Sequence, residues 1–292
     1  MAIADPKKQL RLARTLVDLR ETVAKWRADG ETIGFVPTMG ALHAGHLSLV
    51  EAAARAADRV VVSIFVNPSQ FAPHEDFDAY PRTEETDLAA LHASACALAY
   101  LPDVSTIYPE GFQTSINVSE ISKGLCGATR PHFFGGVATV VCKLLNQCAP
   151  DVAVFGEKDF QQLLVIRRMA RDLDLPVEIL GAPIVREDDG LALSSRNAYL
   201  GEKDRAIAGQ LNMILAHTAE MILSGDDVAT VLNEARTTLL NAGVEAVDYL
   251  ELRRNDDLTP VSARPQKGEA RLFLAAYVGG VRLIDNWPVE RL

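Results

Sequence analysis

Short apolar runs recur along the first two-thirds of the chain, and each is followed by a longer segment in which apolar residues lie three or four apart. The runs predict strands that are buried on both faces of a sheet. They lie at 32–36, 60–66, 97–101, 152–155 and 177–185. The longer segments predict helices with one apolar face. These lie at about 46–57, 84–95, 137–148 and 160–173.

Strands that alternate with helices through short connections predict an α/β fold with a doubly wound, Rossmann-like parallel sheet. In such a sheet, ligands bind beyond the carboxyl ends of the strands, near the point where the strand order reverses. The loops that follow the predicted strands are therefore the first places to look for functional side chains.

After residue 197 the pattern changes to helices and then to three β-rich segments. The helices are expected at about 203–224 and 228–242, and the strands at 246–252, 271–277 and 281–284. A polar stretch at 256–268 predicts a surface loop. We expect a catalytic domain at 1–185 and a smaller α+β domain at 186–292 that closes over its site.

The segment GFVPTMGALHAGH, residues 34–46, joins the first of these strands to the next helix. His43 and His46 are nearly one helical turn apart, so both imidazoles can face the same side. The start of a helix adds unpaired N–H groups and partial positive charge, which suit a phosphate under attack. Gly45 would let a flat ring such as adenine lie against the backbone. Alternatively the two histidines cap the helix or form part of a metal site, although no third ligand has convincing spacing.

Two further loops carry groups suited to phosphate. The sequence Gly156-Glu157-Lys158-Asp159 follows a predicted strand, and lysine can meet phosphate as a point charge. The loop with Ser194, Ser195 and Arg196 lies at the expected domain junction, where hydroxyls and a guanidinium can hold departing pyrophosphate. Taken alone, a lysine at a strand end is usually solvated, and a loop such as the second is more often a plain linker.

Neutral amides and carboxylates supply the remaining candidates. Asn67 and Gln70 follow the second strand, and Gln161 and Gln162 lie on a predicted helix, where glutamine usually faces solvent. The carboxylates in YPRTEETD are charges at a helix N-terminus, or one of them binds Mg²⁺.

Composition limits the partners. The formal net charge is −10 and the pI about 5.1, so nucleic acid and anionic membranes are not expected as partners. The chain shows no apolar run of about 18 residues and no apolar core near its N-terminus, so neither a spanning helix nor a secretory signal is expected. The four cysteines form no CxxC pair, and reduced thiols in a cytoplasmic protein are expected.

Taken together, these segments resemble the pantothenate synthetase (pantoate–β-alanine ligase) family over nearly the whole chain. The matching pieces occur in order and are PTMGALHAGH, IFVNPSQF, YPRTEETDLAAL, DVAVFGEKDFQQLLVIRRM, DGLALSSRN and RLIDN. The resemblance implies ATP-dependent joining of pantoate to β-alanine through a pantoyl adenylate, with Mg²⁺ required, in a cytoplasmic homodimer.

The resemblance also assigns roles to matching positions. It implies His46 as the proton donor, with His43, Lys158 and Arg196 on phosphate. It places pantoate on Gln70 and Gln162, β-alanine on Gln70, Asn67 near substrate and Asp87 near Mg²⁺. The expected ATP contacts are Met39, Gly40, Ala41, Leu42, His43, Ala44, Gly45, His46, Gly156, Glu157, Lys158, Asp159, Val185, Leu193, Ser194, Ser195 and Arg196.

One segment departs from the family pattern R-P-G-H-F-x-G-V. The chain has His132 where the family has glycine, and Phe133 where it has histidine. The geometry of this lid segment is therefore open. Three alternatives remain: an adenylyltransferase with the same HxGH loop, a tRNA-charging enzyme, which the acidic composition disfavours, and a binding homologue without activity.

Overall fold

The computed structural model describes residues 10–71, 77 and 80–290, which form two compact units. The first unit comprises Met1–Ser122, Arg130–Glu157 and Val165–Pro183. The second comprises Lys123–Thr129, Lys158–Leu164 and Ile184–Leu292. The second unit thus includes two short segments that precede residue 185 in the sequence.

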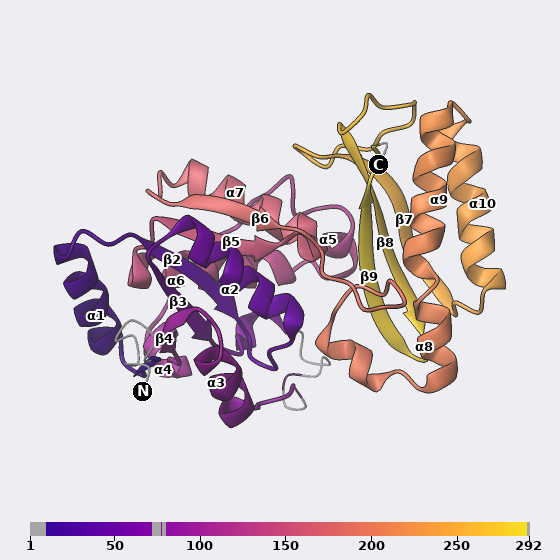
Figure 1. Cartoon of the computed structure of the whole chain (residues 1–292). Coiled ribbons are helices and arrows are strands. Elements are labelled where there is room, and N and C mark those ends of the chain that lie inside the picture. The colour runs from indigo at the N-terminus through magenta and orange to yellow at the C-terminus, as the bar shows by residue number, and fades with distance from the viewer. Residues whose placement is uncertain (1–9, 72–76, 78–79, 291–292) are drawn as a thin grey trace. The chain divides into compact units, whose positions relative to one another are not determined.

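The first unit is built on a six-stranded sheet in which every pairing is parallel (Figure 1). Its strands are β1 (Arg11–Ala13), β2 (Ile33–Thr38), β3 (Arg59–Ile64), β4 (Cys96–Tyr100), β5 (Val152–Gly156) and β6 (Glu178–Ala182). Their order in the sheet is β1-β4-β3-β2-β5-β6. β2, β3 and β4 follow one another outward on one side, with β1 at the edge, and β5 and β6 follow one another on the other side. The predicted α/β sheet is confirmed, and its switch point lies between β2 and β5.

Alternate residues of these strands pack on opposite faces of the sheet. Val36 and Val62 pack with residues of α2 (Ala44–Ala56) and α3 (Glu84–His92). On the other face, the Tyr100 hydroxyl donates to Gln147 Oε1 at 2.9 Å in α6 (Phe133–Cys148), which also contacts α1 (Leu16–Ala28). Because both faces are covered, the strands read as the continuous apolar runs seen in the sequence.

The remaining helices of the first unit are mostly short. They are α4 (Val104–Ile107), the 3₁₀ turn η2 (Pro68–Gln70) and the larger part of α7 (Phe160–Asp172). β1, α1 and α4 were not predicted from the sequence. The strand expected at 177–185 is shorter, because β6 ends at Ala182.

The second unit is an antiparallel three-stranded sheet with its longer helices on one face (Figure 1). Its elements are β7 (Ala246–Arg254), β8 (Ala270–Val278), β9 (Val281–Pro288), α8 (Glu202–Ala208), α9 (Leu211–Ser224), α10 (Val228–Asn241), the short helix α5 (Cys126–Thr129) and the 3₁₀ turn η4 (Ser195–Tyr199). Leu272 and Leu274 pack in one core cluster with residues of α9 and α10. Phe273 points to the opposite face and meets the Phe160 ring at 6.0 Å. The segments around α5 and Phe160 belong to this unit because they cover that second face.

The prediction of one continuous helix at 203–224 is wrong. The structure has two helices there, α8 and α9, separated by Gly209 and Gln210. A Cβ on Gly209 would lie 3.2 Å from a carboxylate oxygen of Asp189. The glycine therefore allows a close approach that a longer side chain would hinder, at the cost of helix propensity. Within the described residues, no helix is long and apolar enough to cross a membrane.

Candidate active site

The loop after β2 is held by one buried carboxylate from α3. Asp87 is 2% exposed. Its Oδ2 accepts from the Ala41 N–H at 3.0 Å and its Oδ1 from the Leu42 N–H at 2.8 Å. Gly40 and Ala41 both have positive φ, 82° and 51°, a backbone conformation that costs alanine energy. The carboxylate therefore stabilises a turn that the local sequence does not favour.

The two histidines of this loop begin α2 and cap it. The His43 Nδ1 accepts from the Gly45 N–H at 3.1 Å, and the His46 Nδ1 accepts from the His43 N–H at 3.3 Å. Their ring centroids are 4.1 Å apart. Because each Nδ1 is an acceptor, the neutral form of each ring carries its proton on Nε2. Both histidines therefore cap the helix, as one of the alternatives predicted. In this tautomer their Nε2–H groups are hydrogen-bond donors at the helix N-terminus.

The loop after β3 forms a second polar centre, around a buried asparagine. Asn67 is 1% exposed. Its Nδ2 donates to Gln70 Oε1 at 3.1 Å and to the Gly136 carbonyl at 3.2 Å, while its Oδ1 accepts from the Tyr108 hydroxyl at 2.8 Å. The Gln70 Nε2 in turn contacts Met39 Sδ at 2.9 Å, which joins this centre to the loop after β2. Asn67 thus fixes the orientation of Gln70.

Sequence reasoning did not find Tyr108 or Gly136 as parts of this centre. Burial raises the pKa of Tyr108, so its hydroxyl remains protonated and available as a donor at neutral pH. A Cβ on Gly136 would lie 2.4 Å from the Ser69 carbonyl oxygen, so only glycine permits the approach. The sequence signal for Gly136 was the pair Gly135-Gly136, which lies in the segment that departs from the family pattern.

The departing segment at 130–136 packs against the same centre. Arg130 donates to the Gln70 carbonyl at 3.2 Å, and its guanidinium lies 4.0 Å from the centroid of the Phe133 ring. His132 precedes α6 at its N-cap. Phe133 therefore has a packing partner within the first unit.

After β5 the chain passes through the 3₁₀ turn η3 (Glu157–Asp159) into α7. The Lys158 Nζ lies 3.6 Å from Asp159 Oδ2, and the Lys158 side chain is 21% exposed. Of the two adjacent glutamines, Gln161 is buried and its amide bonds to the Cys126 N–H and the Gly124 carbonyl. Gln162, the one expected to bind pantoate, is partly exposed.

Residues 185–193 form a hairpin in the second unit. The Leu193 N–H donates to the Val185 carbonyl at 3.0 Å, so these two predicted ATP residues are paired across it. Gly190, with φ of 87°, makes the turn. Beyond it, Ser194 caps η4 by accepting from the Arg196 N–H at 3.3 Å.

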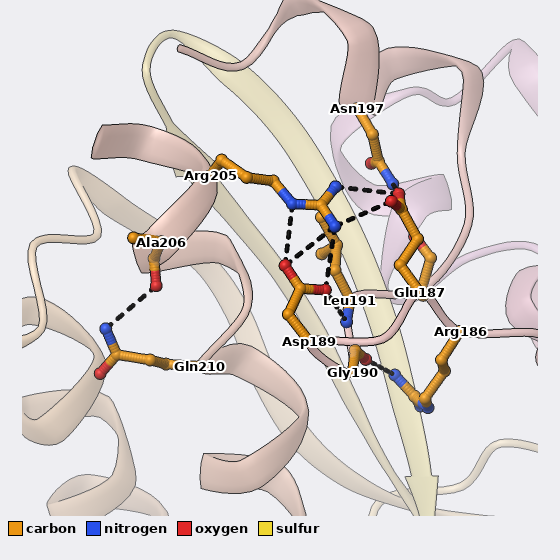
Figure 2. Close-up of polar contacts among 10 residues, drawn as sticks. Arg186, Glu187, Asp189, Gly190, Leu191, Asn197, Arg205, Ala206 and Gln210 are labelled. Carbon is orange, nitrogen blue, oxygen red and sulfur yellow. Dashed lines mark hydrogen bonds and ion pairs between the residues drawn. The ribbon is translucent and has the colours of Figure 1, made fainter. Parts of the chain in front are cut away.

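One arginine of α8 holds the hairpin turn (Figure 2). Arg205 donates to both oxygens of Glu187, at 2.9 and 2.8 Å, and to both oxygens of Asp189, at 2.9 and 2.8 Å. Asn197 Nδ2 also donates to Glu187 Oε1 at 2.8 Å, which ties η4 to the turn. The hydrogen bonds from Arg205 lower the pKa of Glu187. This cluster could not be found from the sequence because its members are up to 18 residues apart.

The structure groups the predicted residues within each unit as follows. The first unit brings together the loop after β2, Gln70, Asn67 and Asp87, and it contains Gly156 and Glu157 at the end of β5. The second unit contains Lys158, Asp159, Gln162, Val185 and the sequence from Leu193 to Arg196. Among the described residues, no group of three or more His, Cys, Asp or Glu side chains is arranged to hold a metal ion.

Comparison with known proteins extends these findings. Residues 11–288 match the family model described as pantoate-beta-alanine ligase. The pantothenate synthetase of Paramagnetospirillum magneticum is 54% identical over 279 residues, covering 96% of this chain and 98% of that protein. That of Chelativorans sp. (strain BNC1) is 55% identical over 278 residues, covering 95% and 97%.

Two solved structures have a similar fold. The pantothenate synthetase of Thermus thermophilus superposes with a TM-score of 0.90 at 45% identity, covering 96% of this chain and 100% of that one. The pantoate-beta-alanine ligase of Francisella tularensis, in complex with beta-gamma ATP and beta-alanine, gives a TM-score of 0.81 at 34% identity, covering 97% and 99%.

Proposed function

Since the chain belongs to the pantoate–β-alanine ligase family, we propose that it joins pantoate to β-alanine with ATP, giving pantothenate, AMP and pyrophosphate. The observation that carries this proposal is the loop from Met39 to His46. It leaves β2 at the switch point of the sheet and ends at the start of a helix, with two histidine Nε2–H donors. The reaction supplies a precursor of coenzyme A.

In the first half-reaction the pantoate carboxylate attacks the α-phosphorus of ATP and pyrophosphate leaves, which gives pantoyl adenylate. His46 donates a hydrogen bond to the phosphate where negative charge develops, with His43 beside it. Lys158 and Arg196 meet the leaving phosphates as cations. The remaining ATP contacts are the predicted backbone and side-chain positions of the loop after β2, of Gly156 to Asp159, and of Val185 and Leu193 to Ser195.

In the second half-reaction the β-alanine amine attacks the acyl carbon, and AMP leaves. Gln70 and Gln162 are proposed to orient pantoate, and Gln70 also β-alanine. Asn67 is 1% exposed and fully engaged with its neighbours, which supports a role in aligning Gln70.

Magnesium would neutralise phosphate charge. Mg²⁺ usually keeps water and substrate phosphates as ligands and needs only one or two carboxylates, so the chain fits this ion if ATP supplies most ligands. Asp87 is the predicted protein ligand, and both of its oxygens already accept hydrogen bonds from the loop. We further propose a cytoplasmic homodimer that acts on small molecules, without a nucleic acid or membrane partner.

The test is the requirement for both organic substrates. Purified protein with ATP and Mg²⁺ should release AMP and form pantothenate only when pantoate and β-alanine are both present. Pantoate alone should support exchange of labelled pyrophosphate into ATP, because the adenylate forms before the amine reacts. Exchange that needs β-alanine would overturn this order. A dinucleotide product would identify an adenylyltransferase, and binding without turnover an inactive homologue.

A further inference from the structure

The RLIDN sequence near the C-terminus has no role in the reaction described so far. It lies on β9, where Asp285 and Asn286 are adjacent and therefore point to opposite faces of the strand. Both side chains are buried, 4% and 1% exposed. Buried polar side chains of this kind cost free energy unless they are fully hydrogen-bonded, so their partners indicate what they stabilise.

On one face, Asp285 holds the hairpin that carries Val185 and Leu193. Arg186 donates to Asp285 Oδ2 at 2.7 Å and to Oδ1 at 2.9 Å, a two-pronged ion pair with defined geometry. The same guanidinium donates to the Gly190 carbonyl at 3.0 Å, at the turn of the hairpin. The base and the turn of the hairpin are thereby fixed to β9 through a single side chain.

On the other face, Asn286 holds the segment that carries Lys158. Its Nδ2 donates to the Lys158 carbonyl at 2.9 Å, and its Oδ1 accepts from Arg271 on the neighbouring strand β8. The Arg271 guanidinium lies 4.1 Å from the centroid of the Phe160 ring, at the start of α7. The backbone of Lys158 is thus fixed while its side chain stays partly exposed.

We propose that Asp285 and Asn286 are positioning residues for ATP, which set the Val185–Leu193 hairpin and Lys158 from the two faces of one strand. The proposal rests on the assignment of Lys158 and the hairpin to ATP. Electrostatic stabilisation of a departing phosphate depends on cations held in advance at the correct place. A strand that fixes both segments keeps them in a constant relation to each other within the second unit.

The decisive variant is Asn286→Asp. It keeps an oxygen to accept from Arg271 and replaces the donor to the Lys158 carbonyl by a second oxygen, so the packing persists while the contact to Lys158 becomes repulsive. The matched control is Asp248→Asn, which weakens the ion pair of Asp248 with Arg282 in the same sheet. Asp285→Asn tests the other face, because it keeps the volume but removes the charge that pairs with Arg186.

For Asn286→Asp we expect about a tenfold loss of pyrophosphate exchange and a raised KM for ATP, the scale of one lost hydrogen bond. In the same variant, amide formation from preformed pantoyl adenylate should change less than twofold. In the control Asp248→Asn, both half-reactions should change less than twofold. Asp285→Asn should also raise the KM for ATP. Circular dichroism and thermal unfolding establish whether each variant is folded. If Asn286→Asp does not fold, Asn286→Ser, with a smaller side chain, takes its place.

A double variant separates this proposal from the assignment of Lys158. If Asn286 acts through Lys158, then Lys158→Ala with Asn286→Asp should lose no more exchange activity than Lys158→Ala alone. Additive losses, or equal losses in both half-reactions, would overturn the positioning role. If Lys158→Ala itself leaves exchange unchanged, the assignment of Lys158 to ATP fails instead.

Discussion

Replacing Asp87 with asparagine should disable the ATP loop while leaving the fold intact. In the wild type the Asp87 Oδ2 accepts from the Ala41 N–H at 3.0 Å, and the Oδ1 from the Leu42 N–H at 2.8 Å. An asparagine can keep the bond to Leu42, but its NH₂ group then faces the Ala41 N–H, donor against donor. A buried donor left without an acceptor costs about 1–3 kcal/mol.

This cost falls on a turn that is already strained, because Ala41 has φ of 51°. If all of it is expressed as loss of the active loop conformation, the exchange rate falls about 5-fold to 150-fold, at roughly 1.4 kcal/mol per factor of ten. The assay is pyrophosphate exchange at saturating pantoate, with unfolding in urea as the measure of stability. Glu85→Gln on the exposed side of the same helix is the control, with the same change of acid to amide.

The same experiment distinguishes positioning from metal binding. If Asp87 acts by holding the loop, the loss in Asp87→Asn should not depend on the Mg²⁺ concentration. A ligand role would instead raise the Mg²⁺ concentration needed for half-maximal activity. A folded Asp87→Asn protein with wild-type exchange, or a loss that excess Mg²⁺ reverses, would refute the reasoning.

Three further predictions follow from the contacts described above. His46→Ala should lower the rate of adenylate formation by two to three orders of magnitude, about 3 kcal/mol, because a donor to developing charge is lost; wild-type single turnover in a folded variant would exclude His46 from the mechanism. Gly136→Ala should destabilise the fold by about 1–3 kcal/mol and raise the KM for pantoate, since its Cβ would lie 2.4 Å from the Ser69 carbonyl; Gly135→Ala, whose Cβ meets only the Ile116 carbonyl at 3.7 Å, is the control, and equal behaviour of the two would contradict the close approach. The lowered pKa of Glu187 means that its pairing with Arg205 stabilises the fold above the ordinary carboxyl pKa of 4.5 and that this contribution is lost as the pH falls through the lowered value. The difference in unfolding free energy between wild type and Arg205→Gln should therefore stay constant from about pH 7 down to the ordinary carboxyl pKa of 4.5 and shrink as the pH falls below it. A difference that stays constant at lower pH as well would show that the pair does not titrate as argued.

The sequence predicted the parallel sheet because β2 to β5 are buried along almost their whole length, which leaves a local and readable apolar run. Capping of α2 was one of the alternatives that the sequence left open, because His43 and His46 contact their own turn. The sequence did not predict the partners of the site. Asp87 could not be linked to Ala41, 46 residues away, and Asn286 could not be linked to Lys158, 128 residues away. Such contacts depend on tertiary packing and leave no periodic signal.

Adjacent residues of one type illustrate the same limit. Gln161 and Gln162 both suggested solvent-facing amides, yet Gln161 is buried and bonds to the Gly124 carbonyl. The break at Gly209 was likewise hidden, because one glycine inside a helical pattern is often tolerated. The proximity of Asp189 to Gly209 became visible only in the fold.

The interleaved course of the chain has a consequence for how the protein can be divided. The chain passes between the two units at 122/123, 129/130, 157/158, 164/165 and 183/184. A fragment that begins at 184 would lack Phe160, whose ring meets Phe273 at 6.0 Å, and Cys126, whose Sγ lies 3.2 Å from the Tyr249 hydroxyl. It would expose to water a sheet face that carries Tyr249 and Phe273, both buried in the intact chain, and should aggregate. Exchange of the C-terminal third between relatives by a single cut would therefore separate this face from the two segments that cover it. A functional chimera needs those segments, 123–129 and 158–164, to come from the same parent as β7 to β9.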